Sequence, residues 1–241
     1  MINLQPVFLY LAEKINMISI IIPTLNEAPN LQKLIPALRQ NTQTPIEIIV
    51  VDGGSTDQSL QICEQHGVKA LTGKRGRAVQ MNFGASHAKG EILYFVHADA
   101  IPPKGYGEAI LTAIQEGYPI GCFRLKFDSK HPLLKINAFF TRFDKSWTRG
   151  GDQTLFVTTS IFEQYQGYDE SCVIMEEYDF MDRVRSKYPF KIIPQNVLIS
   201  ARKYEKNGYF KVQIANLTAM RMYQKGASKK DIAKTYKSLL K

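Results

Sequence analysis

The sequence predicts an α/β protein built on a mostly parallel central sheet with flanking helices and a helical tail at the C-terminal end. Short apolar segments rich in β-branched residues alternate with segments of helical periodicity over the first 127 residues. Such alternation is typical of crossover units, in which a helix connects two parallel strands. The chain has 241 residues, of which 44% are hydrophobic, and we expect one large domain with a tail.

Five segments have the composition of buried strands. The first, ISIII, and the second, IEIIVV, are rich in β-branched residues, whereas the third, VKAL, is short and weak. The fourth is ILYFV and the fifth is GCFRLKF. We therefore expect strands over residues 18–22, 46–51, 68–71, 92–96 and 121–127.

Helical patterns lie between these strands. The first covers residues 30–40 and places its apolar side chains on one face, namely Leu31, Leu34, Ile35 and Leu38. The second and third begin near residues 58 and 77, and we expect Gly67 and Gly90 to end them as C-caps. A fourth helix is expected over about residues 104–116, and beyond Asp128 the strict alternation decays.

Composition limits the class of protein. Three cysteines, Cys63, Cys122 and Cys172, are far apart and lack the short spacings of a zinc site, so neither a disulfide framework nor a zinc site is expected. Reduced cysteines favour a cytoplasmic location. No apolar run approaches the roughly 18 residues that span a bilayer. Residues 1–16 lack the features of a signal peptide, and Met17 directly precedes the first strand, so we treat 1–16 as an N-terminal extension.

The net charge of +9 is concentrated in the tail. Residues 201–241 contain 11 Lys and Arg against 2 Asp and Glu, while residues 1–200 contain 20 of each class. Apolar residues at helical spacing suggest amphipathic helices over 205–241 that contact an acidic partner or an anionic membrane at its inner face. These residues are Tyr209, Val212, Ile214, Leu217 and Met220. The alternative is a helix that packs on the domain with a solvated basic face, and the neutral body argues against a nucleic-acid partner.

Polar residues follow three of the expected strands, at the edge where a parallel sheet binds ligands. The first strand is followed by PTLNE, the second by DGGSTD and the fourth by HAD. Because the carboxyl ends of parallel strands meet at one edge, we expect these segments to form one site. For DGGSTD the alternative is a turn with a helix N-cap at Ser55 or Thr56. That alternative does not explain Asp52, since a carboxylate after six apolar residues needs a partner.

Four segments occur in a characteristic order and spacing: SIIIPTLNE, IVVDGGSTD, GRAVQMNFGA and LYFVHAD. With them the chain resembles the inverting GT-A glycosyltransferases of family 2, and more closely the bacterial radical-SAM or selenodomain-associated transferases, over roughly residues 17–240. The resemblance implies a GT-A fold, with the transferase domain over residues 17–204. It also implies a nucleotide-diphosphate sugar donor, UDP- or GDP-linked.

The resemblance assigns nucleotide contacts to the loops after the first two strands and to the stretch KRGRAVQMN. The residues concerned are Pro23, Thr24, Asn26, Glu27, Asp52, Gly53, Ser55, Arg75, Arg77, Gln80 and Asn82. A carboxylate such as Asp52 can accept a hydrogen bond from a base N–H. For Arg77 the alternative is a helix residue that faces water.

Members of the family usually have Asp-x-Asp after the fourth strand, where this chain has His97, Ala98 and Asp99. Residues i and i+2 of an extended segment point to the same side, so both side chains can reach one diphosphate and its metal. Mg²⁺ or Mn²⁺ on a diphosphate needs only one or two protein carboxylates, and Asp99 is the candidate. His97 suits Mn²⁺ if it is a ligand, can hydrogen-bond the ribose or a phosphate instead, and is otherwise a core histidine.

The resemblance places the catalytic base in a Glu-Asp pair at the start of a helix. The matching pair here is Glu176 and Glu177, which departs from that pattern. Helical periodicity puts Glu177 on the face of Phe180, Met181 and Val184, and Glu176 on a more polar side. Glu177 is therefore the predicted base, with a pKa raised by apolar neighbours, and Glu176 is the second candidate. Without the resemblance, two acids at a helix start would complement the helix dipole.

Two further segments are assigned by the resemblance. Gly151, Asp152 and Gln153 match an element near the acceptor, and Arg202 matches a basic residue that meets the diphosphate. Asp152 could instead cap the strand that follows. The acceptor would be a lipid, a small molecule or a polysaccharide whose hydroxyl, deprotonated by the base, displaces the diphosphate in one inverting step.

Two other functions are considered. A sugar-phosphate nucleotidyltransferase has a similar α/β fold, but it needs a glycine-rich basic loop after the first strand, which PTLNEAPN lacks. The departures at His97 and Glu177 also allow a degenerate domain that acts as a binding module at membranes. A dinucleotide-binding oxidoreductase is excluded because no G-x-G-x-x-G follows the first strand.

Overall fold

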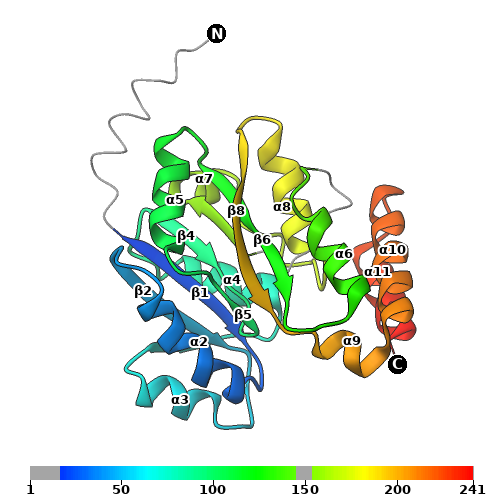
Figure 1. Cartoon of the computed structure of the whole chain (residues 1–241), viewed down its shortest axis with the longest axis horizontal. Coiled ribbons are helices and arrows are strands. Elements are labelled where there is room, and N and C mark those ends of the chain that lie inside the picture. Colours follow the sequence, from blue (N-terminus) through cyan, green and yellow to red (C-terminus); the bar gives the residue numbers. More distant parts are fainter. Residues whose placement is uncertain (1–16, 145–153, 241) are drawn as a thin grey trace.

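The computed structural model describes residues 17–144 and 154–240 and confirms the predicted α/β class. One eight-stranded sheet carries helices on both faces, and the last helices lie together beyond one side of it (Figure 1). The strand order is β3-β2-β1-β4-β7-β6-β8-β5. The predicted N-terminal extension lies outside the described residues.

The first half of the sheet is parallel, as predicted. Its strands are β1 (Ile18–Thr24), β2 (Ile46–Asp52), β3 (Lys69–Thr72) and β4 (Ile92–Phe95). The helices that connect them are α2 (Ala28–Gln40), α3 (Ser59–Gln65) and α4 (Arg77–Ala85). Each crossover returns the chain to the same end of the sheet, so β1, β2 and β4 finish at one edge.

The second half contains the helix expected to begin at Glu176 and Glu177, together with elements that the alternating pattern did not predict. The predicted helix and strand are α5 (Tyr106–Gln115) and β6 (Ile120–Phe127). The others are β5 (Ala100–Ile101), α6 (Pro132–Phe140), β7 (Leu155–Thr158), α7 (Thr159–Gln164), α8 (Glu176–Arg185) and β8 (Phe190–Ile199). β7 is antiparallel to both β4 and β6, so the sheet is mixed beyond β4.

β8 shows why the alternation fails in this half. Its register against β6 jumps from Phe123 opposite Ile193 to Arg124 opposite Asn196. The intervening Pro194 has no N–H to donate to the ladder, and prolines inside a sheet are confined to such bulges and to edges. The bulge adds two residues, Pro194 and Gln195, so Ile193, Val197 and Ile199 still face one core, but the polar Gln195 stands where an apolar residue would continue the two-residue period.

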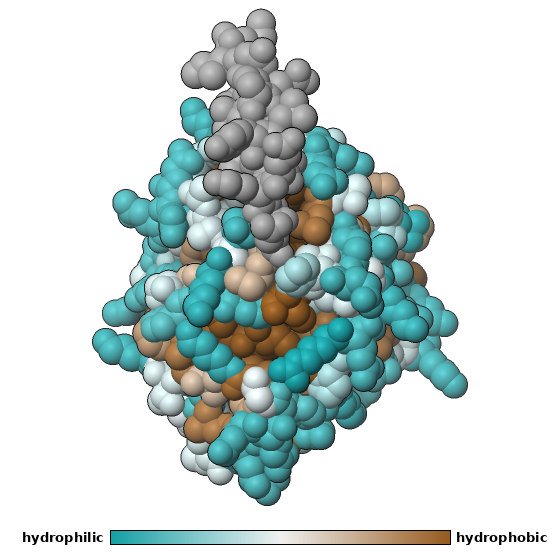
Figure 2. Space-filling view, turned by 90° about the vertical axis from the view of Figure 1, so that its left-hand side faces the viewer, coloured by the Kyte–Doolittle hydropathy of each residue, from teal (hydrophilic) through white to brown (hydrophobic). Residues whose placement is uncertain are grey.

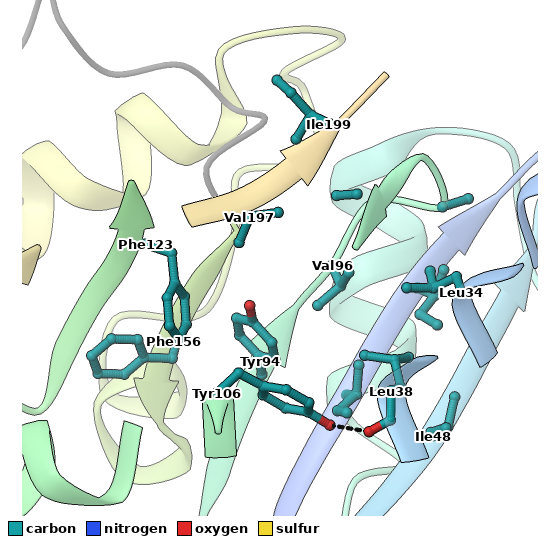
Figure 3. Packing of buried hydrophobic residues seen from close by; sticks show 14 of the residues in the cluster. Leu34, Leu38, Ile48, Tyr94, Val96, Tyr106, Phe123, Phe156, Val197 and Ile199 are labelled. Carbon is teal, nitrogen blue, oxygen red and sulfur yellow. Dashed lines mark hydrogen bonds between the residues drawn. The ribbon is translucent and has the colours of Figure 1, made fainter. Parts of the chain in front are cut away.

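The strands alternate between two cores. Ile18, Ile20 and Ile22 of β1 pack with α2 and α5 on one face, whereas Ile21 packs with α4, α7 and α8 on the other. Figure 3 shows the first core, where the rings of Tyr94 and Tyr106 stack with centroids 5.6 Å apart. The Tyr106 hydroxyl donates to the Leu38 carbonyl at 2.9 Å, which satisfies a polar group deep inside this core.

The C-terminal helices are α9 (Arg202–Asn207), α10 (Tyr209–Gln224) and α11 (Lys229–Leu239). α10 buries Val212, Ala215 and Ala219, so the tail packs on the domain. Ile214 and Leu217, which were expected on the same apolar stripe, are exposed instead. The predicted boundary between residues 204 and 205 falls inside α9.

Of the two predicted glycine caps, one is confirmed and one is wrong. Gly67 follows the C-cap of α3 with a φ of 59°, in the left-handed region that favours glycine. α4 already ends at Ala85 with Ser86 as its C-cap, so Gly90 does not cap it. Gly90 is required for another reason, because a Cβ there would lie 2.7 Å from the Met17 carbonyl oxygen.

The left-hand side of the molecule in Figure 1 faces the viewer in Figure 2, where hydrophilic side chains surround a central group of apolar ones.

The three cysteines are buried and free. Over residues 17–144 and 154–240, no helix combines the length and apolar character needed to cross a bilayer.

Candidate active site

The loops after β1 and β2 are tied together at the carboxyl edge of the sheet. The Gly53 amide donates to the Thr24 carbonyl at 2.9 Å, and the Asn26 amide donates to Ser55 Oγ at 2.8 Å. The Thr56 amide donates to Asn26 Oδ1 at 2.7 Å, and Asn26 adopts a φ of 55°. The predicted convergence of these two strand ends is therefore present.

Asp52 closes the turn after β2 and keeps one unused acceptor. Its Oδ2 accepts from the amides of Gly54 and Ser55, both at 2.9 Å. Its Oδ1 is buried and has no hydrogen-bond partner among the described residues. Helix α3 begins at Ser59 after Gln58, so the alternative of a cap at Ser55 or Thr56 is wrong. A buried acceptor without a donor is the kind of atom that a ligand N–H would satisfy.

Arg202, at the start of α9, joins the ends of β1 and β4. Its guanidinium donates to both carboxylate oxygens of Glu27, with Nη1 3.0 Å from Oε2 and Nη2 closer still to Oε1. Nη2 also lies 3.5 Å from Asp99 Oδ2. The carboxylate of Glu27 raises the pKa of Arg202. The exposed guanidinium of Arg202 thus lies between the carboxylates of Glu27 and Asp99, although Glu27 and Arg202 are 175 positions apart in the sequence.

Behind this group, His97 contacts the predicted base. His97 Nε2 lies 3.1 Å from Glu177 Oε1 across 80 residues of sequence. Glu177 stands in the first turn of α8, and the residue before the helix, Met175, has a φ of 70° that non-glycine residues rarely adopt. The left-handed backbone at Met175 turns the chain into α8 and points the two acids towards β4.

The expectation that Glu176 lies on a polar side of α8 is wrong. Its side chain is fully buried, and Oε1 lies 3.0 Å from Arg77 Nε in an ion pair that lacks hydrogen-bond geometry. Burial and the neighbouring Glu177 carboxylate raise the pKa of Glu176 to about 7, against the opposing effect of Arg77. The sequence pattern fails because Arg77, at the start of α4, lies against the side of α8 that was expected to face water. Arg77 is bound to this acid and does not simply face solvent.

Two residues expected to touch the nucleotide hold protein backbone instead. Gln80 is buried, and its Nε2 donates to the carbonyls of Thr24 at 2.8 Å and Val51 at 2.7 Å. Asn82 exchanges hydrogen bonds with the backbone of Tyr168, at 2.8 Å from Nδ2 and 2.9 Å to Oδ1. Both amides therefore hold protein backbone, and their contact with a nucleotide stays a prediction.

The remaining predicted residues are placed more simply. Pro23 and Thr24 are buried in β1, paired with Val51 and Asp52 of β2. Ala98 is buried in the turn after β4, and Arg75 is exposed in the loop before α4. Gly151, Asp152 and Gln153 lie outside the described residues.

The described residues fit a metal bound mainly by its substrate. They contain no cluster of three or more His, Cys, Asp or Glu side chains able to cage an ion. Asp99 is partly exposed at the sheet edge, where one carboxylate could complete the shell of Mg²⁺ or Mn²⁺ on a diphosphate. His97 Nε2 faces Glu177, which makes it a partner of the base more than a metal ligand.

A cavity of about 610 Å³ opens beside Glu177 and Arg77. It is bounded by α6, the start of α8, α9, α10 and α11. No segment of the sequence indicated this cavity. No local pattern could have done so, because its wall is assembled from side chains between Arg77 and Tyr236.

The family model described as "Glycosyl transferase family 2" matches residues 19–170. The chain belongs to glycosyl transferase family 2. The matched region contains the loops after β1, β2 and β4, with Asp52 and Asp99, while Glu177 and Arg202 lie beyond it.

Curated relatives of this family 2 chain are similar over part of their length. The glycosyltransferase GlyG of Streptococcus pneumoniae is 35% identical over 107 residues, which are 42% of this chain and 36% of GlyG. The undecaprenyl-phosphate 4-deoxy-4-formamido-L-arabinose transferase of Yersinia enterocolitica is 31% identical over 121 residues, 45% of this chain and 37% of that protein. The match thus spans little more than a third of these relatives.

Solved structures show that this family 2 chain has the GT-A glycosyltransferase fold. The mannosyltransferase PcManGT of Pyrobaculum calidifontis, in complex with GDP-Man and Mn²⁺, superposes with a TM-score of 0.63 at 20% identity, covering 92% of this chain and 69% of that one. S. aureus TarS 1–349 with UDP gives 0.62 at 17% identity, covering 83% and 64%. The predicted fold class is confirmed.

Proposed function

We propose that this family 2 glycosyltransferase moves a sugar from a UDP- or GDP-sugar to an acceptor hydroxyl, with inversion at the anomeric carbon. The observation that carries the proposal is the meeting of Glu27, Asp99 and Arg202 at the carboxyl edge of the parallel strands, with His97 and Glu177 beside them. PcManGT is described in complex with GDP-Man and Mn²⁺, and TarS in complex with UDP, which supports the donor class. We also propose that the chain belongs to the radical-SAM-associated subgroup of this family.

The donor would lie across the loops after β1, β2 and β4. The unused Oδ1 of Asp52 suits a base N–H, and Asp99 would hold a divalent ion on the diphosphate. When bound, that ion neutralises charge on the departing diphosphate. Arg202 adds a second cation at the same place, since its guanidinium already lies between two carboxylates and is half-exposed.

Glu177 is the proposed base. Its carboxylate lines the cavity, whereas Glu176 is fully buried, so only Glu177 presents an oxygen to an entering hydroxyl. His97 orients the carboxylate through Oε1. Glu177 takes the hydroxyl proton as the acceptor oxygen bonds to the anomeric carbon and the bond to the diphosphate breaks. One such displacement inverts the configuration.

Titration with UDP- and GDP-sugars, with and without Mn²⁺, tests the donor site. We expect metal-dependent binding by the wild type and its loss in Asp99→Ala. Glu177→Gln should bind the donor normally and lose turnover by about 100-fold or more, in the range of general-base effects. Glu64→Gln, an exposed change on α3, serves as the control.

Three outcomes would contradict parts of the assignment. Equal donor binding with and without Mn²⁺ would show that the donor site does not require a metal. Unchanged turnover in Glu177→Gln would move the base elsewhere. A wild type that binds donors but never cleaves them would favour the degenerate binding module.

We also propose a cytoplasmic protein that contacts anionic bilayers through its basic tail. The tail carries 11 basic against 2 acidic residues. Its exposed lysines are Lys206, Lys211, Lys225, Lys230, Lys234 and Lys237. Pelleting with phosphatidylglycerol vesicles, but not with phosphatidylcholine vesicles, is the expected result. Equal pelleting with both lipids would show that the positive charge of the tail does not drive membrane binding.

A further inference from the structure

The cavity beside Glu177 has a mostly apolar wall. Thirteen of its twenty lining residues are aliphatic, aromatic or methionine, and only Arg77, Glu177 and Lys203 are charged. Its volume of about 610 Å³ is in the usual range for small-molecule sites. A wall of this kind suits a ligand with an apolar body and one polar end.

Several polar groups in the wall are bonded to one another. The Tyr209 hydroxyl donates to Asn137 Oδ1 at 2.9 Å, and the Tyr236 hydroxyl donates to Asn216 Oδ1 at 3.1 Å. These bonds join α6 to α10 and α10 to α11. The Tyr209 ring also stacks with the rings of His131 and Tyr204, with centroids 5.7 Å and 6.0 Å apart. Lys203 Nζ lies over the Tyr236 ring, 5.0 Å from its centroid. The wall is therefore a fixed aromatic surface.

The mouth of the cavity is apolar and exposed. Ile136, Phe140 and Leu217 all line the cavity, yet Ile136 is 50% exposed and Leu217 is 51% exposed. Seven of the ten exposed large hydrophobic side chains among the described residues belong to α6, the turn after it and α10, which lie side by side in Figure 1. They are Ile136, Phe139, Phe140, Phe143, Phe210, Ile214 and Leu217. Such concentration marks a binding surface.

We propose that this cavity is the acceptor site and that the acceptor is an amphiphile with an extended apolar body. The inference rests on the proposed function, because it places the reacting hydroxyl at Glu177. The polar end would lie at Glu177 with Arg77 and Lys203 nearby, and the apolar body would run along the rings of Tyr204 and Tyr209 to the mouth. An entirely polar acceptor would gain little from this apolar wall, whereas an apolar body would bury surface against it.

The length of the apolar chain provides the test. Each methylene buried in an apolar site contributes about 0.8 kcal/mol, or a factor of roughly three to four in affinity. Butyl and octyl β-glucoside, each below its critical micelle concentration, are the probes, and binding is measured by calorimetry in the presence of UDP and Mn²⁺. We expect octyl glucoside to bind at least 30-fold more tightly than butyl glucoside.

Two variants at the mouth of the cavity test whether the octyl chain binds there. Leu217→Asp and Ile136→Asp place a charge on an exposed position, so the fold should survive, and both should abolish the preference for the octyl chain. Leu60→Asp is the matched control, since Leu60 is 41% exposed on α3, away from the cavity lining. UDP binding should stay unchanged in all three variants.

The outcomes separate the hypotheses. Equal binding of butyl and octyl glucoside, or an unchanged octyl preference in Leu217→Asp, would overturn the inference. Octyl preference without any UDP binding would refute the proposed donor site but not the apolar ligand. A wild-type dimer that Leu217→Asp dissociates, without octyl preference, would assign the surface to a second copy and overturn the proposal. Binding to octyl glucoside in solution indicates a free amphiphile, whereas binding only to the glucoside in phosphatidylglycerol vesicles indicates a membrane-borne one.

Discussion

Replacing Glu176 with Gln should change how the stability of the protein depends on pH. The carboxyl group is fully buried, and its pKa is raised to about 7 from an ordinary value of 4.5, first by burial and then by Glu177. The folded protein therefore holds a proton that the unfolded chain releases between these two pH values. Stability from the protonated group is fully present below pH 4.5 and is lost as pH rises to about 7.

The size of the effect follows from the two pKa values. One pKa unit corresponds to about 1.4 kcal/mol, so the difference between 4.5 and about 7 corresponds to roughly 3 kcal/mol in the free energy of unfolding. Gln resembles the protonated acid and does not ionise. The Glu176→Gln variant should therefore match the wild type near pH 5 and exceed it by up to about 3 kcal/mol at pH 8.

Urea unfolding at pH 5, 6, 7 and 8 measures this difference directly. The control is Glu64→Gln, whose side chain is exposed on α3 and should give a difference that does not vary with pH. If the stability difference between Glu176→Gln and the wild type stays constant from pH 5 to pH 8, the pKa of Glu176 is not raised in the folded protein. That result would mean that Arg77 keeps the acid ionised in the folded state.

Two further predictions concern how the sheet edge is held together. Gln80→Ala should lower the free energy of unfolding by about 2 kcal/mol, because the carbonyls of Thr24 and Val51 each lose one buried hydrogen bond. Urea unfolding beside the exposed control Gln61→Ala checks this, and a loss no larger than that of the control would contradict it. Gly84→Ala should destabilise by about 1–3 kcal/mol, because its Cβ would lie 2.6 Å from Ile21 Cγ2 and 3.0 Å from Val51 Cγ2. A raised melting temperature in that variant would show that helix propensity outweighs the clash.

The parallel half of the fold was predictable because its signals are local. The apolar runs of β1 and β2 are continuous, since both faces of each strand are covered by helices. Asp52 and Asp99 could be named as site residues because each follows directly on a buried strand. β8 was missed because Pro194 and the bulge interrupt its period. α6 was missed because its apolar residues do not form one buried stripe, since Leu134 is buried while Ile136, Phe139 and Phe140 are exposed.

The sequence by itself determined the α/β class, the parallel half of the sheet and the three strand ends that meet at its carboxyl edge. It determined these because strand composition, helical periodicity and crossover geometry depend on neighbours within a few residues. Only the tertiary structure decided that Glu176 is buried against Arg77, that His97 contacts Glu177, and that Gln80 holds backbone. Those contacts join residues about 30 to 100 positions apart, so their burial and partners depend on how whole elements pack.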